Sequence, residues 1–573
     1  MKAFKYIIVV FLLVLLSCKK ESNSEKLETI IALYQKERTY DFDRYQSVEN
    51  TIAYYQAEAD FSAELKTQLK EVSSEGLTET EEISRELLLF QLQDKIDTNT
   101  YKMYLNTITN ENAFHLRLND IGNQTFKTKE DVITYLEELA LLPKKVDYNL
   151  GILRATIKEK TTQPIVIFHN YEDTYNKHIV SNVTESDFYR PFYKLPNSFS
   201  SPLKDSILTV AKQSIQNNVV AQYKKIKSFF EKEYFPNTRK GLGISTVPNG
   251  AEFYQNRVNY YTTSTKYTPE DIHQIGLKEV ARIKEEMQTI IDDLGFAGSF
   301  AEFLEFLRTD EQFYPKTGRA LLMFARDISK RIDAELPKYF KTLPRKPYGV
   351  VPVPDALAPN YTGGRYSHAA DEKEAGYYWV NTYNLPSRTL YTIPALTAHE
   401  AVPGHHLQIS LNSELPESIP NFRRKLYLSA YGEGWGLYSE YLADEMGIYT
   451  TPYEKFGQLT YEVWRACRLV VDTGIHAKGW TRKQVLDYMT QNTALSIHEV
   501  TTETDRYISW PGQAISYKIG EIKIRELRRK AETELKDKFD IRAFHEIILE
   551  QGTVTLPILE RRVNNYINKV KNE

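Results

Sequence analysis

The residues best suited to chemistry in this chain lie between positions 397 and 408, in the stretch TAHEAVPGHHLQ. His399 and Glu400 stand side by side, as they do on helices that bind zinc through histidine and use the adjacent glutamate as a general base. Such a helix carries a second histidine four residues after the first, because positions four apart share a face. Here the next histidines come later, at positions 405 and 406. The pattern predicts a metal site, but its second ligand needs a separate argument.

Neither late histidine fits a regular helix. At 3.6 residues per turn, position 405 lies about 120° around the axis from His399, and position 406 lies about 10 Å further along. Pro403 lacks an N–H for the helix ladder and Gly404 tolerates unusual backbone conformations, so we expect a bulge or kink. A bulge that absorbs two residues returns His405 to the usual place of the second ligand. We therefore prefer His405 as the ligand over His406, which would then support the site or face the substrate.

A catalytic zinc site has three protein ligands and keeps one position open for water. The stretch SAYGEGWGLYSEYLADEMG at 429–447 offers Glu433, Glu440 and Glu445 as the third ligand. Glu433 and Glu440 are seven residues apart and share a helix face. Glycines on both sides of Glu433 allow close backbone approach, so we prefer Glu433 as the ligand and expect Glu440 to support a histidine. The alternative is that Glu433 only interacts with the helix dipole.

Amide hydrolysis also needs a donor that stabilises the oxyanion, and Tyr507 is our candidate for that donor. Arg506 could bind a substrate carboxylate. The stretch YYWVNTY at 377–383 could pair as a strand with an extended peptide, which would bring Asn381 close to the substrate. Each of these residues also has an ordinary structural explanation. The full set of candidate substrate contacts is Asn381, His406, His498, Arg506 and Tyr517.

The elements that must position these residues show mainly helical periodicity. Thr128 and Thr268 are expected to cap long helices, since acidic residues follow each of them within the first turn. The segment 376–396 is rich in β-branched and aromatic residues around an Asn-Leu-Pro-Ser break, which predicts a short hairpin. The expected fold is mainly α, a large helical body with a cleft and one small antiparallel β-sheet beside the helix that carries His399.

The polar stretch NTRKGLGISTVPNG at 237–250 is the best candidate for a junction, because it contains three glycines and a proline. We divide the chain near it into an N-terminal helical region, 29–240, and a catalytic region, 241–573. We expect both regions to form one continuous helical body.

The charges are nearly balanced, with 73 lysines and arginines against 76 aspartates and glutamates. The chain therefore lacks the basic excess that is typical of nucleic-acid-binding proteins, and we expect a peptide rather than a nucleic acid as its partner. The oligomeric state leaves no signature in the sequence.

The N-terminus predicts export. Residues 1–18 combine a basic start, a short apolar run and Leu-Leu-Ser-Cys, which resembles the bacterial lipobox. Cys18 would then carry the lipid anchor, and the polar residues 19–28 would form a tether. The alternative is a plain signal peptide with a coincidental cysteine. We expect a protein anchored by lipid to the cell envelope, on a periplasmic or surface face.

Several blocks of the sequence together resemble one bacterial family, domain of unknown function 885. They are HEAVPGHHLQ, GEGWGLYSEYLADEMG, GLGISTVPNGAEFYQNRVNYYTT, DTGIHAKGW and DRYISWPGQAISYKIG. The resemblance spans roughly residues 30 to 565. That family in turn resembles the helical gluzincin peptidases of the thermostable carboxypeptidase and thimet oligopeptidase type.

Carried over to this chain, the resemblance implies Zn²⁺ as cofactor, His399, His405 and Glu433 as ligands, and Glu400 as base. The Pro-Gly insertion departs from the gluzincin pattern and puts the second ligand in question. The expected function is an exported zinc peptidase. The alternatives are a metal-dependent amidase that acts on cell-wall or modified peptides, and an inactive peptide-binding lipoprotein.

Overall fold

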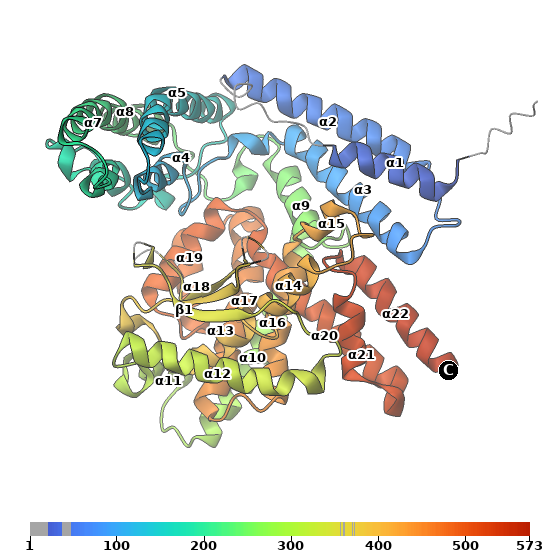
Figure 1. The fold of residues 1–573 in the computed structure, drawn as a ribbon. Coiled ribbons are helices and arrows are strands. Elements are labelled where there is room, and N and C mark those ends of the chain that lie inside the picture. The colour runs from blue at the N-terminus through green and yellow to red at the C-terminus, as the bar shows by residue number, and fades with distance from the viewer. Residues whose placement is uncertain (1–20, 37–46, 356, 359–360, 370, 372) are drawn as a thin grey trace, which may run out of the picture.

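Figure 1 shows the computed structural model of the chain, which describes residues 21–36, 47–355, 357–358, 361–369, 371 and 373–573. The predicted signal peptide at 1–18, including the candidate lipidation site Cys18, lies outside the described residues.

The predicted tether at 19–28 is helical from Asn23 onward. Ser22 and Glu25 form a capping box, in which the Glu25 carboxylate accepts the Ser22 N–H at 2.8 Å and the Ser22 hydroxyl accepts the Glu25 N–H at 3.2 Å. These bonds satisfy backbone donors that a helix start leaves free. The polar composition of this segment therefore reflects a capped, solvent-facing helix start.

Three N-terminal helices pack around an apolar cluster of their own, which includes Leu27, Leu69 and Leu88. They are coloured blue in Figure 1 and comprise α1 (Asn23–Gln35), α2 (Val48–Lys70) and α3 (Glu79–Thr100). A second group of helices follows beside them, and Thr128 caps its longest member as predicted. This group consists of α4 (Phe114–Arg117), α5 (Lys129–Glu159), α6 (Asp173–Asn176), α7 (Ser201–Ser214) and α8 (Ala221–Phe229).

The rest of the chain forms a larger helical body below these two groups in the view of Figure 1. Its first long helix is capped by Thr268 as predicted. The helices are α9 (Gly250–Tyr261), α10 (Pro269–Asp293), α11 (Phe300–Thr309), α12 (Gly318–Tyr339), α13 (Ile393–Glu400), α14 (His405–Ser413), α15 (Asn421–Arg424), α16 (Ser429–Glu445), α17 (Pro452–Lys478), α18 (Arg482–Asn492), α19 (Ile497–Ser509), α20 (Ser516–Leu535), α21 (Ile541–Leu549) and α22 (Leu556–Asn572).

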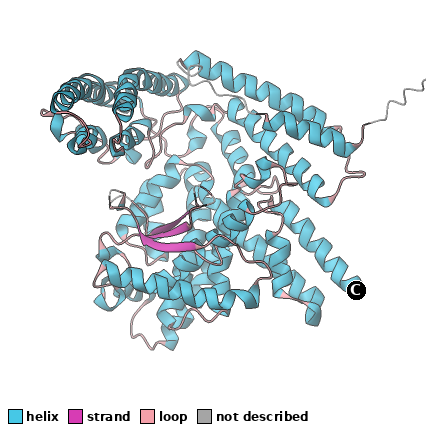
Figure 2. Ribbon diagram, in the orientation of Figure 1, coloured by secondary structure: helices cyan, strands magenta, loops and turns pink. Residues whose placement is uncertain are grey.

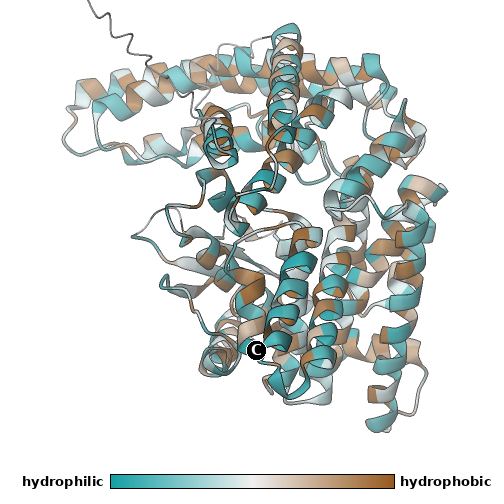
Figure 3. Cartoon of the chain, turned by 90° about the vertical axis from the view of Figure 1, so that its right-hand side faces the viewer, coloured by the Kyte–Doolittle hydropathy of each residue, from teal (hydrophilic) through white to brown (hydrophobic). Residues whose placement is uncertain are grey.

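Helix α17 lies at the centre of this body and packs against α10, α13, α16, α18, α19 and α20. Nearly all of its side chains from Glu454 to His476 are buried, including the free thiol of Cys467. Figure 3 shows apolar and polar residues interleaved along the helices of the chain, as expected for helices with one face in the core. Several buried positions of α17 are charged, so the interior that surrounds it is polar as well as apolar.

The only sheet among the described residues has three strands, and Figure 2 shows it as a small element beside the helices. Its strands are β1 (Tyr348–Pro352), β2 (Gly364–Ser367) and β3 (Gly376–Val380). The order is β1-β3-β2, with β1 parallel and β2 antiparallel to β3. The fold is mainly α, as predicted, but the sheet is mixed rather than antiparallel.

The hairpin predicted over 376–396 is wrong. Only 376–380 forms a strand, and its partners come from the preceding proline- and glycine-rich segment. After the strand the chain enters short helical turns, because Pro386 lacks the N–H that a returning strand needs and Pro394 suits a helix start. β3 is thus the central strand, and β2 is an edge.

Candidate metal centre

The helix that carries the His-Glu pair ends at Glu400, and a new helix begins at His405. In the turn between them the Gly404 N–H donates to the carbonyl of Ala398 at 3.0 Å. A side chain at position 404 would come within 1.9 Å of the His399 carbonyl oxygen, so the turn requires glycine there. The predicted bulge is therefore a complete break between two helices.

The break brings His399, His405 and Glu433 together. The Nε2 atom of each histidine lies 3.4 Å from Glu433 Oε2, and the three ligand atoms are all within 4.8 Å of one another. Both histidines are buried. Zinc bonds of about 2.0–2.2 Å in a tetrahedral arrangement separate neighbouring ligand atoms by about 3.3–3.6 Å. The donor set is therefore one that zinc accepts, and both distances to Glu433 Oε2 match the spacing of zinc ligands.

No other group of three His, Cys, Asp or Glu side chains in the described part of the chain converges in this way. The structure also distinguishes the two candidate histidines. His406 turns away from the cluster, and its Nδ1 lies 3.1 Å from the Tyr366 hydroxyl while its ring packs on Tyr348. His405, not His406, is the histidine that faces Glu433.

Glu440 holds the first histidine. The Nδ1–H of His399 donates to Glu440 Oε1 at 2.7 Å, which leaves the Nε2 lone pair directed at the cluster. Glu440 is fully buried and also lies 3.5 Å from Arg465 Nη2. The predicted support of a histidine by Glu440 is confirmed.

Helix α16 approaches the cluster closely. A side chain at Gly436 would lie 2.7 Å from the His399 ring, so this glycine makes room for the imidazole. The indole N–H of Trp435 donates to the Pro403 carbonyl at 2.8 Å and so satisfies a polar group of the turn. The sequence around Glu433 therefore positions the first histidine as well as the third candidate ligand.

Tyr427 orients Glu433. Its hydroxyl donates to Glu433 Oε1 at 2.8 Å, so the other carboxylate oxygen is the one that faces the histidines. A side chain at Gly432 would lie 2.4 Å from the Tyr427 ring, so this position also needs a glycine. Tyr427 is 44% exposed, so its hydrogen bond to Glu433 lies on the solvent side of the cluster.

Glu400 lies at the boundary between the cluster and the sheet. Its Oε2 accepts the backbone N–H of Tyr366 at 2.8 Å. Because β2 is the edge strand, this bond shows that its free edge faces Glu400. The candidate base is thus fixed by a backbone donor and stays partly exposed.

The histidines and glutamates of the cluster shift one another's pKa values. Burial alone would lower the pKa of His399, but the bonds to Glu433 and Glu440 outweigh it and raise the pKa to about 9. Burial would raise the pKa of Glu433, but the charges and hydrogen bonds of His405 and His399 hold it well below the ordinary value. The lone pairs that take protons in this arrangement are those that a metal ion would use.

Asn381 is not available to a substrate. It is fully buried, and its amide nitrogen lies 2.9 to 3.0 Å from three carbonyl oxygens of the loop before β2, those of Ala358, Tyr361 and Thr362. Its Oδ1 accepts the Tyr383 N–H at 3.0 Å. The residue holds a loop, so its prediction as a substrate contact is wrong.

Tyr507 is also engaged elsewhere. Its buried hydroxyl donates to Glu503 at 2.7 Å and accepts hydrogen bonds from Trp464 and Arg468, both at 2.9 Å. The proton that an oxyanion would need is therefore already committed. Arg506 is tied to the same carboxylate, with Nη2 at 2.9 Å from Glu503 Oε2.

The last two candidates differ in their surroundings. His498 lies exposed in the first turn of α19, and the described residues give it neither a hydrogen bond nor an ion pair. Tyr517 is half-buried, and the guanidinium of Arg468 lies 4.4 Å from the centre of its ring. The Tyr517 hydroxyl lies 3.5 Å from the side-chain nitrogen of Gln513, whose oxygen accepts a hydrogen bond from Arg506.

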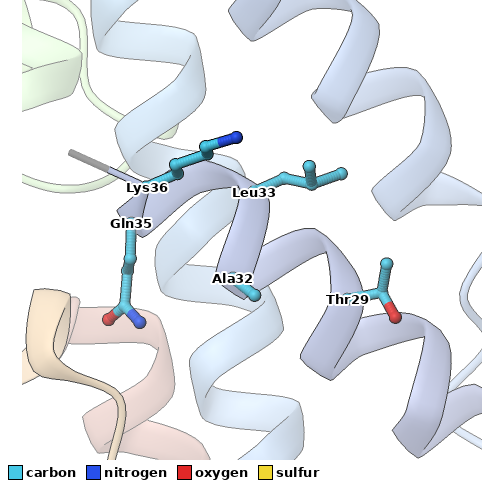
Figure 4. Close-up of a pocket in the computed structure, with 5 residues that line it drawn as sticks. All are labelled: Thr29, Ala32, Leu33, Gln35 and Lys36. Carbon is cyan, nitrogen blue, oxygen red and sulfur yellow. The ribbon is translucent and has the colours of Figure 1, made fainter. Parts of the chain in front are cut away.

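Two residues that contact the candidate site were missing from the sequence prediction, Tyr427 and Tyr366. Tyr427 acts through its side chain from the loop before α16, and Tyr366 acts through its backbone amide. No spacing rule connects either of them to the His-Glu pair. Figure 4 shows a separate depression lined by Thr29, Ala32, Leu33 and Gln35 of α1 and by Lys36, which follows the helix. It contains none of the chemical groups of the cluster.

The fold and the cluster define a mainly α protein that brings two histidines and a glutamate from three helices to one point. Over residues 38–563 the chain matches a family described as bacterial protein of unknown function, DUF885, and it belongs to that family. No curated protein sequence matches the chain.

Two solved structures are similar over almost the whole chain. One is a candidate lipoprotein from Colwellia psychrerythraea, with 26% identity, a TM-score of 0.79, and coverage of 96% of this chain and 100% of that one. The other is a candidate lipoprotein of unknown function from Shewanella oneidensis, with 18% identity, a TM-score of 0.63, and coverage of 94% and 96%. Within the described residues, every helix is too short or too polar to span a bilayer.

Proposed function

We propose that this protein is an exported, lipid-anchored zinc peptidase, with His399, His405 and Glu433 as metal ligands and Glu400 as general base. The spacing of the ligand atoms supports this most directly, because both histidine nitrogens lie 3.4 Å from one carboxylate oxygen. Two histidines and a glutamate are also the donor set of known catalytic zinc sites in peptidases.

A zinc ion bound there would polarise the scissile carbonyl and lower the pKa of a water molecule. Glu400 would take the proton from that water and pass it to the leaving amine, while the Tyr366 N–H holds the carboxylate in place. Glu440 keeps His399 in the tautomer whose Nε2 is free to bind a metal. The Tyr427 hydroxyl orients Glu433 by donating to Oε1, which leaves Oε2 to face the histidines.

The edge strand β2 offers a way to hold an extended peptide. Its free edge faces Glu400, so a peptide added as a further strand would pass the general base. Pairing through the main chain gives affinity with little dependence on side chains. β2, rather than the central strand β3, is the strand that we propose for this role.

The envelope location rests on the N-terminal sequence and on the relatives. Residues 1–18 have the pattern of a lipoprotein signal peptide, and both similar structures are described as candidate lipoproteins. A lipid on Cys18 would hold the helical body at the membrane surface. Labelling with a radioactive fatty acid should mark the wild type and should not mark Cys18→Ala.

The catalytic proposal is tested by comparing wild type and Glu400→Gln on a library of quenched fluorescent peptides. Glutamine keeps an acceptor for the Tyr366 N–H but removes the base, so we expect hydrolysis to fall by about 10²–10⁴. Zinc content should stay near one ion per chain. Glu417→Gln, an exposed carboxylate outside the site, is the matched control.

Chelation of the wild type should abolish hydrolysis, and added zinc should restore it. Undiminished hydrolysis by the chelated protein or by Glu400→Gln would refute the proposal.

A further inference from the structure

The side of His399 that faces away from the candidate ligand atoms leads to a buried arginine. The Nδ1–H of His399 donates to Glu440 Oε1 at 2.7 Å, and Arg465 Nη2 lies 3.5 Å from the same oxygen. Glu440 is fully buried, and Arg465 is only 5% exposed. Arg465 is therefore placed against the carboxylate oxygen that holds the histidine.

The buried charge of Glu440 needs a compensating group. A carboxylate in the interior is unfavourable unless a cation or several hydrogen-bond donors face it. Within the described chain, the Glu440 side chain has a hydrogen bond with His399 and an ion pair with Arg465, and its Oε2 has no hydrogen-bond partner. Glu440 is in turn the one described carboxylate within ion-pair distance of Arg465. The two buried charges therefore compensate each other.

Two aromatic rings of α17 hold the guanidinium of Arg465. It lies 4.5 Å from the centre of the Tyr461 ring and 4.5 Å from the centre of the Trp464 ring. Its Nη1 also donates to the Tyr461 carbonyl at 3.3 Å. A guanidinium stacks on aromatic rings because it is planar, so these contacts restrict its orientation. The cation that faces Glu440 is thus held in a defined position.

Tyr507, which the sequence suggested as an oxyanion donor, supports this arrangement. Its hydroxyl accepts the indole N–H of Trp464 at 2.9 Å, and both side chains are buried. A ring that is fixed by packing and by a hydrogen bond offers a rigid surface to the guanidinium. Contacts therefore lead from Tyr507 through Trp464 to the arginine that adjoins Glu440.

On the basis of the proposed zinc site, we propose that Arg465 is a positioning residue for the metal ligand His399 and acts through Glu440. The guanidinium compensates the carboxylate and holds it in place. The carboxylate in turn holds the imidazole with its Nε2 directed at the ligand cluster. Residues of this kind raise the affinity of a metal site without touching the metal.

A double-mutant cycle with zinc affinity as its readout tests this role. The wild type, Arg465→Met, Glu440→Gln and the double variant are compared by competition with a chromogenic chelator. We expect Arg465→Met to lower the zinc affinity about tenfold when Glu440 is present. In the Glu440→Gln background the same substitution should lower it less than about twofold, because the carboxylate that Arg465 positions is already gone.

Arg468→Met is the matched control. Arg468 lies three residues further along α17, is 3% exposed, and has its guanidinium 4.3 Å from the centre of the Trp464 ring. It pairs with Glu503 rather than with Glu440, at 3.1 Å. Its replacement should leave the zinc affinity of the folded protein unchanged, which separates a role at the site from a general effect on this part of the core.

Cobalt gives a second readout, because the visible absorption of bound Co²⁺ reports the geometry of its ligands. The absorption bands should shift in Arg465→Met and stay in place in Arg468→Met. Thermal melting shows which variants are folded. If Arg465→Met is not, Arg465→Lys takes its place in the cycle. Lysine keeps the charge but not the planar stacking, so it should lower the zinc affinity about two- to fivefold, again only where Glu440 is present.

An equal loss of affinity in both backgrounds, or no loss when Glu440 is present, would overturn the proposal and leave the zinc site intact. A wild type that binds zinc but does not hydrolyse peptides would refute the peptidase function alone, because the cycle measures binding. A wild type that binds no zinc would refute both.

Discussion

Two buried clusters of polar side chains in this protein contain similar residues but differ in the balance of their charges. The first surrounds Lys518, which is fully buried and forms ion pairs with Glu462 and Glu521 at 2.8 Å and with Glu279 at 3.1 Å. Arg282 and Arg525 also pair with Glu462. Three cations therefore meet these three carboxylates, and each carboxylate has a cationic partner. Arg282 also pairs with the exposed Glu286.

The second group is the candidate metal centre. Three carboxylates, Glu400, Glu433 and Glu440, lie there, and Arg465 is the one described arginine or lysine within ion-pair distance of any of them. In the balanced network each buried charge is compensated within the protein, whereas Glu433 faces two histidine nitrogens, which together form a donor set that suits a metal ion. The comparison separates a structural ion network from a candidate binding site, although both are buried and rich in glutamate.

The largest expected effect concerns the second ligand. His405→Ala removes one of the three ligands, so zinc content should fall from about one ion per chain to near zero after dialysis. His406→Ala removes a ring that packs on Tyr348 and should leave zinc in place. Elemental analysis by mass spectrometry measures both. The reverse outcome would assign the site to His406.

The Lys518 network should respond in stability rather than in metal content. Lys518→Met leaves Glu462 and Glu521 buried with fewer cations, which should lower the free energy of unfolding by about 3–5 kcal/mol. Lys530→Met, on the same helix but with a 43% exposed side chain, should change it by less than about 1 kcal/mol. Chemical denaturation measures both. A zinc loss in the folded Lys518→Met protein would show that the two groups are coupled.

Glu440→Gln should have an intermediate effect. The glutamine still accepts the His399 Nδ1–H but no longer carries charge, so zinc affinity should fall about 10- to 100-fold. Competition with a chromogenic chelator measures the affinity. Glu445 lies on the same helix and pairs with Arg528 rather than with a histidine. The zinc affinity of Glu445→Gln should therefore match that of the wild type. An unchanged affinity in Glu440→Gln would mean that Glu440 only fills the core.

The smallest effect is expected for Tyr427→Phe. It removes one hydrogen bond to Glu433, worth about 0.5–1.5 kcal/mol, and so should weaken zinc binding about two- to tenfold. Tyr339→Phe, which loses a bond to the Glu445 carbonyl, is the control. A loss beyond a hundredfold would indicate that Tyr427 does more than orient the carboxylate.

Much of the local structure could be predicted because its causes are local. Thr128 and Thr268 cap helices through residues within one turn, and the break at Pro403-Gly404 follows from the two residue types themselves. The hairpin predicted over 376–396 is wrong because a β-favouring composition does not reveal which strand is the partner. β3 pairs with segments on its N-terminal side because Pro386 prevents a return.

The remaining site residues could not be predicted, because their partners are distant in the sequence. The bond between Tyr366 and Glu400 joins an edge strand to a helix end through a backbone amide, which has no residue-type signature. Tyr507 and Asn381 have suitable chemistry, but neighbouring groups already occupy their hydrogen-bonding capacity. Availability of a polar atom is a property of packing rather than of residue type.

The sequence by itself determined the mainly helical fold, the His-Glu pair and the break that lets a later histidine return to it, because these depend on neighbouring residues. Only the tertiary structure decided that His405 rather than His406 faces Glu433, and that Glu400 meets the edge of β2. It also decided that the guanidinium of Arg468 packs over the ring of Tyr517. Each of these depends on the relative positions of separate helices and strands, which long-range packing sets.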